Sequence, residues 1–190
     1  MWLEKTFLSN YEFYAKYHHD PINKIIHVIF VWPILATFLY LFAMTGPLFT
    51  INGQDNIFNI EFDYAFIIAS IYILFYMTIE QPGLCGVFSA FLVGFFLKIA
   101  NDYQGFYTWQ TITTLNISCW VAQFIGHGIF EGRSPALVDN LLQAFLFAPL
   151  FVMLELWFMI GYKSGLEAKV SQNVETILAN EKKKNSKKTK

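Results

Sequence analysis

Residues 20–44 read DPINKIIHVIFVWPILATFLYLFAM, a run of mostly apolar side chains. Asp20 suits a helix N-cap and Pro21 suits the first helical position, because proline lacks the backbone N–H that would be unpaired there. The run from Pro21 to Met44 is close to the roughly 20 apolar residues that cross a bilayer as a helix. It therefore predicts a membrane-spanning helix that begins at Pro21 and ends before the following Gly-Pro pair.

The composition of the whole chain is that of a membrane protein. Of its 190 residues, 55% are hydrophobic and 21 are Phe, and the mean hydropathy is +0.41. These values exceed what a soluble domain of this size usually carries. The sequence contains no phosphate loop, dinucleotide fingerprint, haem motif or nucleophile elbow, and we expect no nucleic-acid partner.

Further apolar segments predict an all-α, polytopic membrane helical bundle. Tyr64–Ile79 and Gly83–Ile99 form a second and a third span, and Trp109–Phe130 forms a fourth. The fourth span carries six polar side chains, which we expect to face other helices rather than lipid. They are Thr111, Thr113, Thr114, Asn116, Ser118 and Gln123.

A fifth hydrophobic segment, Leu141–Tyr162, differs from the other four. Pro149 interrupts it and Glu155 lies well within it. A proline removes a helical hydrogen bond, and a charged side chain is unfavourable in lipid, so both residues predict a broken or re-entrant path. The sequence thus predicts four full spans plus a broken or re-entrant fifth segment.

The distribution of charge predicts an orientation. Lys5 and Lys16 precede the first span and Lys24 lies at its start, whereas the loop 47–63 contains no Lys or Arg, so the N-terminus should be cytosolic. Six of the last nine residues are lysines, which favours a cytosolic C-terminus as well. The final four residues, 187–190, read KKTK and resemble the dilysine retrieval signal of endoplasmic-reticulum membrane proteins. We therefore expect a multi-pass protein of that membrane with its tail in the cytosol.

All four histidines of the chain fall in two short patches, 17–27 and 126–133. Both patches abut apolar segments, where an ionisable side chain is unfavourable unless it has a partner or a function. Four crossings separate the patches, and an even number returns the chain to the same face, so the patches are expected to meet. This arrangement predicts a metal site on the cytosolic side whose candidate ligands are His18, His19, His27 and His127.

Three other polar residues of the patches are candidates for the same site. Glu131 lies four residues after His127, so its carboxylate could complete the coordination sphere or hold that imidazole from outside it. Asn23 could satisfy the first turn of its helix or contact a substrate. Arg133 could be a positive-inside anchor or could bind the carboxylate of a lipid acid through two hydrogen bonds.

The donor types restrict the metal without choosing it. Imidazole and carboxylate suit Fe(II), Zn(II) and Mn(II), and several neutral histidines with open positions are typical of non-haem iron that binds O2. Two other classes of function remain open at this point. One is a zinc-dependent membrane lipid hydrolase, in which the metal activates water, and the other is a non-enzymatic membrane scaffold with interfacial histidines.

These motifs together resemble the endoplasmic-reticulum 2-hydroxy fatty acid dioxygenase family. The resemblance rests on YHHDPIN at 17–23, on His27 and on QFIGHGIFEGRSPAL at 123–137, and it continues to the Lys-rich tail. It implies a non-haem Fe2+ enzyme that uses O2 to shorten 2-hydroxy fatty acids by one carbon, the alpha-oxidation step of phytosphingosine breakdown. It also implies that the histidines are iron ligands, with His18 favoured over His19 because relatives more often share that position.

The chain is expected to divide into two parts. Residues 1–170 would form a membrane-embedded catalytic domain, with Glu131 and Asn23 as candidate catalytic residues. The run of lysines predicts that 171–190 form a solvated, disordered, Lys-rich cytosolic tail. The expected partners are a 2-hydroxy fatty acid, O2 and the lipid bilayer. The sequence departs from many relatives at Phe30, where they have glycine, and at Gly132, where they have lysine.

Overall fold

A computed structural model of the chain describes residues 2–52, 59–79, 82–132 and 141–188. The chain divides into two compact units. The first unit contains Met1–Val28 and Phe124–Lys190, and the second contains Ile29–Gln123. Both candidate histidine patches belong to the first unit, so its packing determines the site.

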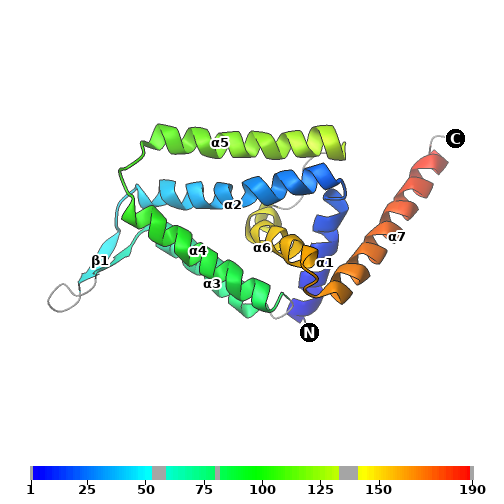
Figure 1. Cartoon of the computed structure of the whole chain (residues 1–190), viewed down its shortest axis with the longest axis horizontal. Helices are drawn as coiled ribbons and strands as arrows, with labels where there is room; N and C mark the ends of the chain where they lie inside the picture. Colours follow the sequence, from blue (N-terminus) through cyan, green and yellow to red (C-terminus); the bar gives the residue numbers. More distant parts are fainter. Residues whose placement is uncertain (1, 53–58, 80–81, 133–140, 189–190) are drawn as a thin grey trace. The chain divides into compact units, whose positions relative to one another are not determined.

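The first unit is built around helix α1, Trp2–Tyr17 (Figure 1). Helix α1 contacts α6, Leu141–Met159, and α7, Ser164–Lys188. Aromatic rings form the contact with α6, since Phe151 lies 5.6 Å from Phe7 and 5.1 Å from Tyr11, measured between ring centroids. Burial of such large apolar side chains is the main favourable term in this packing.

The turn between α1 and α2 has the predicted chemistry. Helix α2 is Pro21–Ala43, and the Asp20 carboxylate accepts hydrogen bonds from the backbone N–H groups of Ile22 and Asn23 at 2.8 and 3.1 Å. The start of the helix at Pro21 and its cap at Asp20 are therefore confirmed. The break between the two helices is what allows His18 to point back toward residues of α2.

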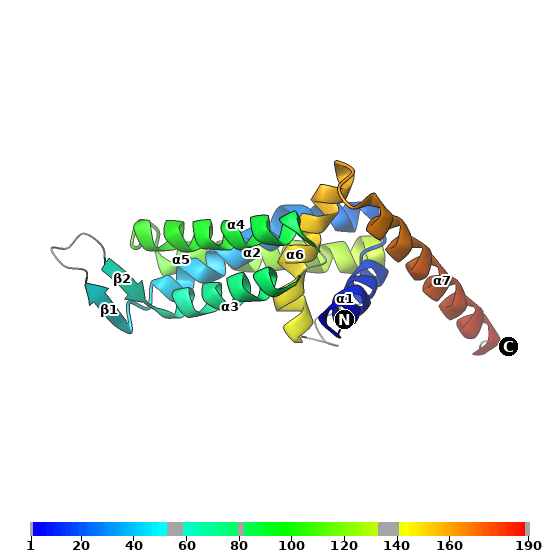
Figure 2. The same ribbon diagram turned by 90° about the horizontal axis from the view of Figure 1, so that it is seen from below.

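The second unit contains the rest of α2 and the elements up to α5. Strands β1, Phe49–Asn52, and β2, Asn59–Phe62, pair antiparallel, and α3, Tyr64–Thr78, follows them (Figure 2). Helix α4, Leu84–Asp102, packs along α3. Helix α5, Trp109–Ile125, leads into a π-helical turn, η2, Gly126–Glu131. The all-α class is confirmed, with the two-stranded hairpin as an addition that the sequence analysis did not predict.

The predicted number of full spans is supported only in part. Within the described residues, two helices are long and apolar enough to cross a membrane, Pro21–Ala43 and Leu84–Asp102. Helix α3 is shorter, at 15 residues, and α5 has 17 residues of more polar composition. A bent pair, Phe145–Met159 with Ser164–Asn180, would count as a third span if it is one broken crossing.

The fifth hydrophobic segment is broken, but not at the predicted residue. Helix α6 continues through Pro149, and the chain bends by 114° after Met159. Gly161 adopts a left-handed conformation with φ of 83°, and the N–H of Tyr162 bonds to the carbonyl of Trp157. This is a Schellman helix end, and the rings of Tyr162 and Trp157 supply its usual apolar contact. Gly161 therefore ends the helix. Pro149 does not end it, because a proline removes only one hydrogen-bond donor and is tolerated in membrane helices.

The predicted disorder of the tail is also corrected. Helix α7 continues to Lys188, and Val170 and Val174, one helical turn apart, are buried. This short apolar face packs on α1, which the charge run in the sequence did not reveal. In both views the C-terminal part of α7 extends away from α1 and α6 (Figures 1 and 2).

Candidate metal centre

Three histidines from separate elements meet inside the first unit. His18 follows α1, His27 lies in α2 and His127 lies in η2, and their side chains are 6%, 5% and 4% exposed. One ring nitrogen of each lies within 4.8 Å of the others. The ring centroids are 4.2 to 4.9 Å apart. The structure thus brings the two sequence patches together through these three side chains.

Backbone carbonyls hold two of the rings in one orientation. Nδ1 of His18 lies 2.7 Å from the carbonyl oxygen of Tyr14, and Nδ1 of His27 lies 2.9 Å from that of Asn23. Each carbonyl is four residues earlier in the chain and can only accept a hydrogen bond, so Nδ1 carries the hydrogen and Nε2 keeps its lone pair. Metal-binding histidines commonly donate their second N–H in this way.

Buried nitrogens without partners indicate what the cluster is suited to hold. Nε2 of His18 and Nδ1 of His127 are buried and have no hydrogen-bond partner. Leaving buried polar atoms unsatisfied is unfavourable by about 1–3 kcal/mol each, so their convergence in one place requires an explanation. A cation that accepts their lone pairs would satisfy them, and three imidazoles provide a donor set typical of Fe, Zn, Cu or Ni.

The electrostatics of the cluster favour the neutral form of His18. Burial lowers the pKa of His18 well below its ordinary value, and the neighbouring His27, His127 and Lys24 lower it further. The ring also stacks on Tyr14, with centroids 4.0 Å apart. Only the unprotonated nitrogen can bind a metal, so the site is prepared for a cation at neutral pH.

Glu131 connects the two patches through hydrogen bonds to the backbone and to Asn23, not to the imidazoles. Its carboxylate accepts the backbone N–H of His19 at 3.1 Å and that of Asp20 at 2.9 Å, and the side-chain amide of Asn23 at 3.2 Å. These are charge-assisted bonds at the start of α2, where the helix dipole also favours an anion. Glu131 therefore fastens η2, which carries His127, to the turn that carries His18.

Asn23 is buried completely and lies against Gly126. A Cβ at Gly126 would overlap Oδ1 of Asn23 and would lie 3.5 Å from Ile26. Only glycine lets the first turn of α2 come this close to η2. Asn23 thereby has two roles. Its backbone carbonyl orients the ring of His27, and its side-chain amide donates a hydrogen bond to Glu131.

Comparison with known proteins identifies the family of the chain. Residues 4–160 match the family model described as "2-hydroxy-palmitic acid dioxygenase Mpo1-like". The chain belongs to this family. It is also 32% identical, over 171 residues, to the 2-hydroxy-palmitic acid dioxygenase MPO1 of Saccharomyces cerevisiae, a match that covers 88% of each chain. No solved structure gives a significant match.

One sequence-predicted site residue of this Mpo1-like chain stands apart from the three imidazoles, and another lies outside the described residues. His19 is exposed and lies outside the group of three. It lines a hollow of about 460 Å³ with Lys16, Asp20, Pro21, Phe130, Glu131 and Leu178. Arg133 lies outside the residues that the structure describes, so its proposed contact with a carboxylate stays a prediction.

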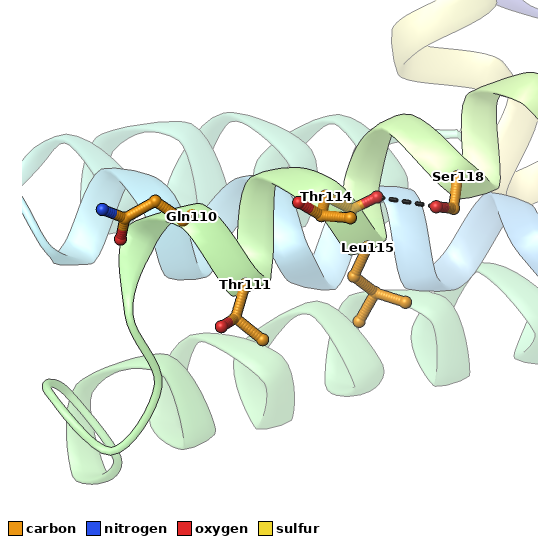
Figure 3. Close-up of a pocket in the computed structure, with 5 residues that line it drawn as sticks. All are labelled: Gln110, Thr111, Thr114, Leu115 and Ser118. Atoms are coloured by element: carbon orange, nitrogen blue, oxygen red, sulfur yellow. Dashed lines mark hydrogen bonds between the residues drawn. The ribbon is translucent and has the colours of Figure 1, made fainter.

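A second hollow, of about 500 Å³, lies on α5 of this Mpo1-like chain (Figure 3). Its lining residues are Gln110, Thr111, Thr114, Leu115 and Ser118. These side chains are exposed, although the sequence predicted that Thr111, Thr114 and Ser118 would face other helices. The Ser118 hydroxyl donates to the carbonyl of Thr114 at 2.8 Å, and this bond within the helix satisfies a polar side chain on an outer face. None of the five is a common metal ligand.

Two features of the Mpo1-like site were missed by the sequence analysis. Tyr14, which stacks on His18, is one helical turn before it, and that spacing was available in the sequence. Glu155 was noted only as a reason for a broken span. In the structure its carboxylate accepts hydrogen bonds from Tyr11 and Lys24, which are far from it in sequence. The charge of Glu155 inside an apolar segment was the signal that could have identified this network.

Proposed function

We propose that this protein is a non-haem Fe(II) dioxygenase that shortens 2-hydroxy fatty acids by one carbon. One observation carries the proposal, which is the convergence of three buried, neutral imidazoles in a chain of the Mpo1-like family. Imidazole ligands with open positions suit an iron ion that must also bind O2 and substrate. The reaction would serve the alpha-oxidation of 2-hydroxy fatty acids released in phytosphingosine breakdown.

The residues present suit such an ion. His18, His27 and His127 would hold it, and each supplies one nitrogen without a charge. A bound Fe(II) would supply electrons to O2 and coordination positions for a chelating substrate. Three neutral ligands leave the charge of a divalent cation uncompensated, which favours binding of an acid. The role of this chain would be to hold the imidazoles in place and to exclude water by burial.

The other predicted site residues receive supporting roles in the proposal. Glu131 and Asn23 would position the ligands through the hydrogen bonds described above. Arg133 would bind the substrate carboxylate with its planar guanidinium group. Arg133→Lys should then raise the KM for the acid without loss of bound iron, because lysine keeps the charge but not the two parallel donors. An unchanged KM would assign Arg133 to a membrane-anchor role.

The membrane would deliver the substrate. Two helices long and apolar enough to cross a bilayer support a membrane location, and the acyl chain of the acid would partition into the same bilayer. We place the protein in the endoplasmic reticulum with the active site and the tail facing the cytosol. Protease added to sealed microsomes should then remove a C-terminal epitope. Protection of that epitope would contradict the cytosolic tail and leave the metal site unaffected.

The decisive experiment is anaerobic reconstitution of the purified protein with Fe(II), followed by addition of O2 and lipid mass spectrometry. We expect one iron per chain and O2-dependent conversion of a 2-hydroxy acid to the acid one carbon shorter. His27→Ala, which removes one imidazole, is the matched control and should show neither bound iron nor O2-dependent conversion. Iron binding without any loss of 2-hydroxy acid would contradict the proposed activity.

A zinc-dependent hydrolase is the second candidate. Three histidines with an open fourth position are also a known catalytic zinc set, in which the metal lowers the pKa of bound water. The same purified protein distinguishes the candidates. Zinc with turnover that does not require O2 would support the hydrolase, and the absence of any bound metal would support a scaffold.

A further inference from the structure

A charged network lies beside the three histidines, and it makes none of the hydrogen bonds that orient their rings. The Glu155 carboxylate of α6 accepts a hydrogen bond from the hydroxyl of Tyr11 at 2.9 Å and pairs with the ammonium of Lys24 at 3.1 Å. The side chain of Glu155 is 15% exposed. Taking a carboxylate out of water in an apolar helix is unfavourable, and such residues usually have a function.

The position of Lys24 connects this network to the histidines. Lys24 lies three residues before His27, so the two side chains are neighbours on the surface of α2. The positive charge of Lys24 is also one of the causes that lower the pKa of His18. Tyr11 approaches from the other direction, because its ring stacks with Tyr14, which stacks with His18. All of these residues belong to the first unit.

Lys24 retains capacity for a ligand. An ammonium group has three donors, and the structure shows one hydrogen bond from Lys24, to Glu155. Its side chain is 36% exposed, whereas the histidines are buried. The Lys24 ammonium is therefore accessible to a ligand from outside the protein. The bond to Glu155 holds the flexible lysine side chain in one place, which reduces the entropy lost when a ligand binds.

We propose that Lys24 binds the carboxylate of the lipid acid substrate, and that Glu155, itself held by Tyr11, positions the Lys24 ammonium beside the metal centre. This assignment rests on the proposed dioxygenase function for the identity of the acid. The chemistry recognised is a carboxylate at the end of a long acyl chain.

Three variants separate substrate binding from a purely structural ion pair. Lys24→Met keeps the length of the side chain and removes its donors. We expect the KM for a 2-hydroxy fatty acid to rise about tenfold or more, the usual effect of losing a hydrogen bond from a charged group, with bound iron retained. Glu155→Gln keeps an oxygen acceptor for Lys24 and should change KM by no more than about threefold.

The double variant Lys24→Met/Glu155→Gln provides the sharpest test. It removes both charges, so no unpaired carboxylate remains buried, and it should be more stable to heat than Lys24→Met alone. Its KM should nevertheless remain as high as that of Lys24→Met. If the double variant regains the KM of the unmodified protein, the pair is only structural and the proposal is wrong. Lys98→Met is the control, because Lys98 forms an exposed pair with Asp102 on α4.

A binding measurement keeps this proposal separate from the proposed function. Palmitate, which lacks the 2-hydroxyl group, and hexadecanol, which lacks the carboxylate, are titrated into the metal-loaded protein in nanodiscs without O2. Lys24→Met should weaken palmitate binding about tenfold and leave hexadecanol binding unchanged. Equal palmitate affinity in both proteins would overturn the role of Lys24. A protein that binds palmitate through Lys24 but never consumes 2-hydroxy acid would instead contradict the proposed reaction.

Discussion

The two units of the molecule differ in how their buried polar side chains are hydrogen-bonded. In the second unit, Thr37 and Ser89 donate to carbonyls of their own helices, and Asn116 donates to Thr37 and to the carbonyl of Ile34. The bonds of Asn116 join α5 to α2, and those of Thr37 and Ser89 stay within one helix. In the first unit, His18 and His27 each donate from one ring nitrogen to a backbone carbonyl. The second nitrogen of His18 and one nitrogen of His127 have no hydrogen-bond partner, and both rings belong to the group of three imidazoles.

This difference distinguishes a structural polar group from a binding site. A buried amide or hydroxyl that finds a backbone partner needs nothing further. Several unsatisfied nitrogens that face one another are unfavourable in the free protein and become favourable when a cation binds. Unsatisfied atoms also occur in the second unit, at Trp32, Asp63, Asn101 and Gln123, but these four residues lie in separate segments of the chain.

The largest expected effect is loss of bound metal when an imidazole is removed. His18→Ala, His27→Ala and His127→Ala should each lose bound iron and activity while the protein still accumulates in the membrane. Changes outside the ligands already cost about 10–100-fold in metal affinity, so loss of a ligand should have a greater effect. Metal analysis of the purified variants checks this, and a stoichiometric ion in His27→Ala would remove the central assignment.

Two control variants sharpen the comparison with the second unit. Asn116→Ala should keep the metal and lower the free energy of unfolding by about 1–3 kcal/mol, because its partners lose a buried hydrogen bond. His19→Ala should retain more iron than His18→Ala, since the His19 side chain is exposed and outside the group of three. Equal loss of iron in the two variants would mean that both imidazoles bind.

A smaller effect is expected when Glu131 is changed. Glu131→Ala removes the acceptor for two backbone N–H groups and for Asn23, so η2 and the start of α2 should separate slightly. We expect metal affinity to fall by about 10–100-fold. The affinity of Glu131→Gln should lie between those of Glu131→Ala and the unmodified protein, because glutamine keeps one acceptor oxygen. Competition with a chelator measures the affinity. Asp102→Asn, an exposed acid in the second unit, is the control and should behave as the unmodified protein.

The close approach of Gly126 to Asn23 predicts an effect on stability. Gly126→Ala places a methyl group where Oδ1 of Asn23 lies, and overpacking of this kind usually costs about 1–3 kcal/mol. Gly128→Ala, two residues later in η2, meets nothing within 4 Å and should be neutral. Thermal unfolding of the two variants provides the comparison. Equal midpoints would contradict the packing of η2 on α2.

The smallest expected effect is a dependence of local stability on pH in the metal-free protein. The pKa of His18 is lowered by folding, so its contribution to stability is complete above the unfolded pKa of about 6.5 and is lost as the pH falls below it. All four histidines belong to the first unit and none to the second. Hydrogen exchange, corrected for its intrinsic rate, should therefore accelerate in the first unit between about pH 7.5 and about pH 5.5. Equal acceleration in both units would contradict this origin.

Local features of the molecule were predictable because they depend on residues close in sequence. Asp20 and Pro21 are sufficient to start a helix, since the capping bonds reach only two or three residues ahead. The apolar runs likewise determined the helical class and most of the segments. The location of the histidines in two patches beside these runs predicted a metal site, and the family resemblance predicted the reaction class.

Only the tertiary structure decided which side chains meet at the site. The orientation of the His18 ring depends on the end of α1, and Glu131 bonds to His19 across 112 residues of sequence. The partners of Glu155 are 144 and 131 residues away. Such contacts form because separate helices pack their apolar faces together, and a hydrogen bond or ion pair between them has no periodicity that a sequence could display. Residue types therefore indicated the kind of chemistry, and packing decided which histidine of the doublet joins the other two and which carboxylate bonds across the two patches.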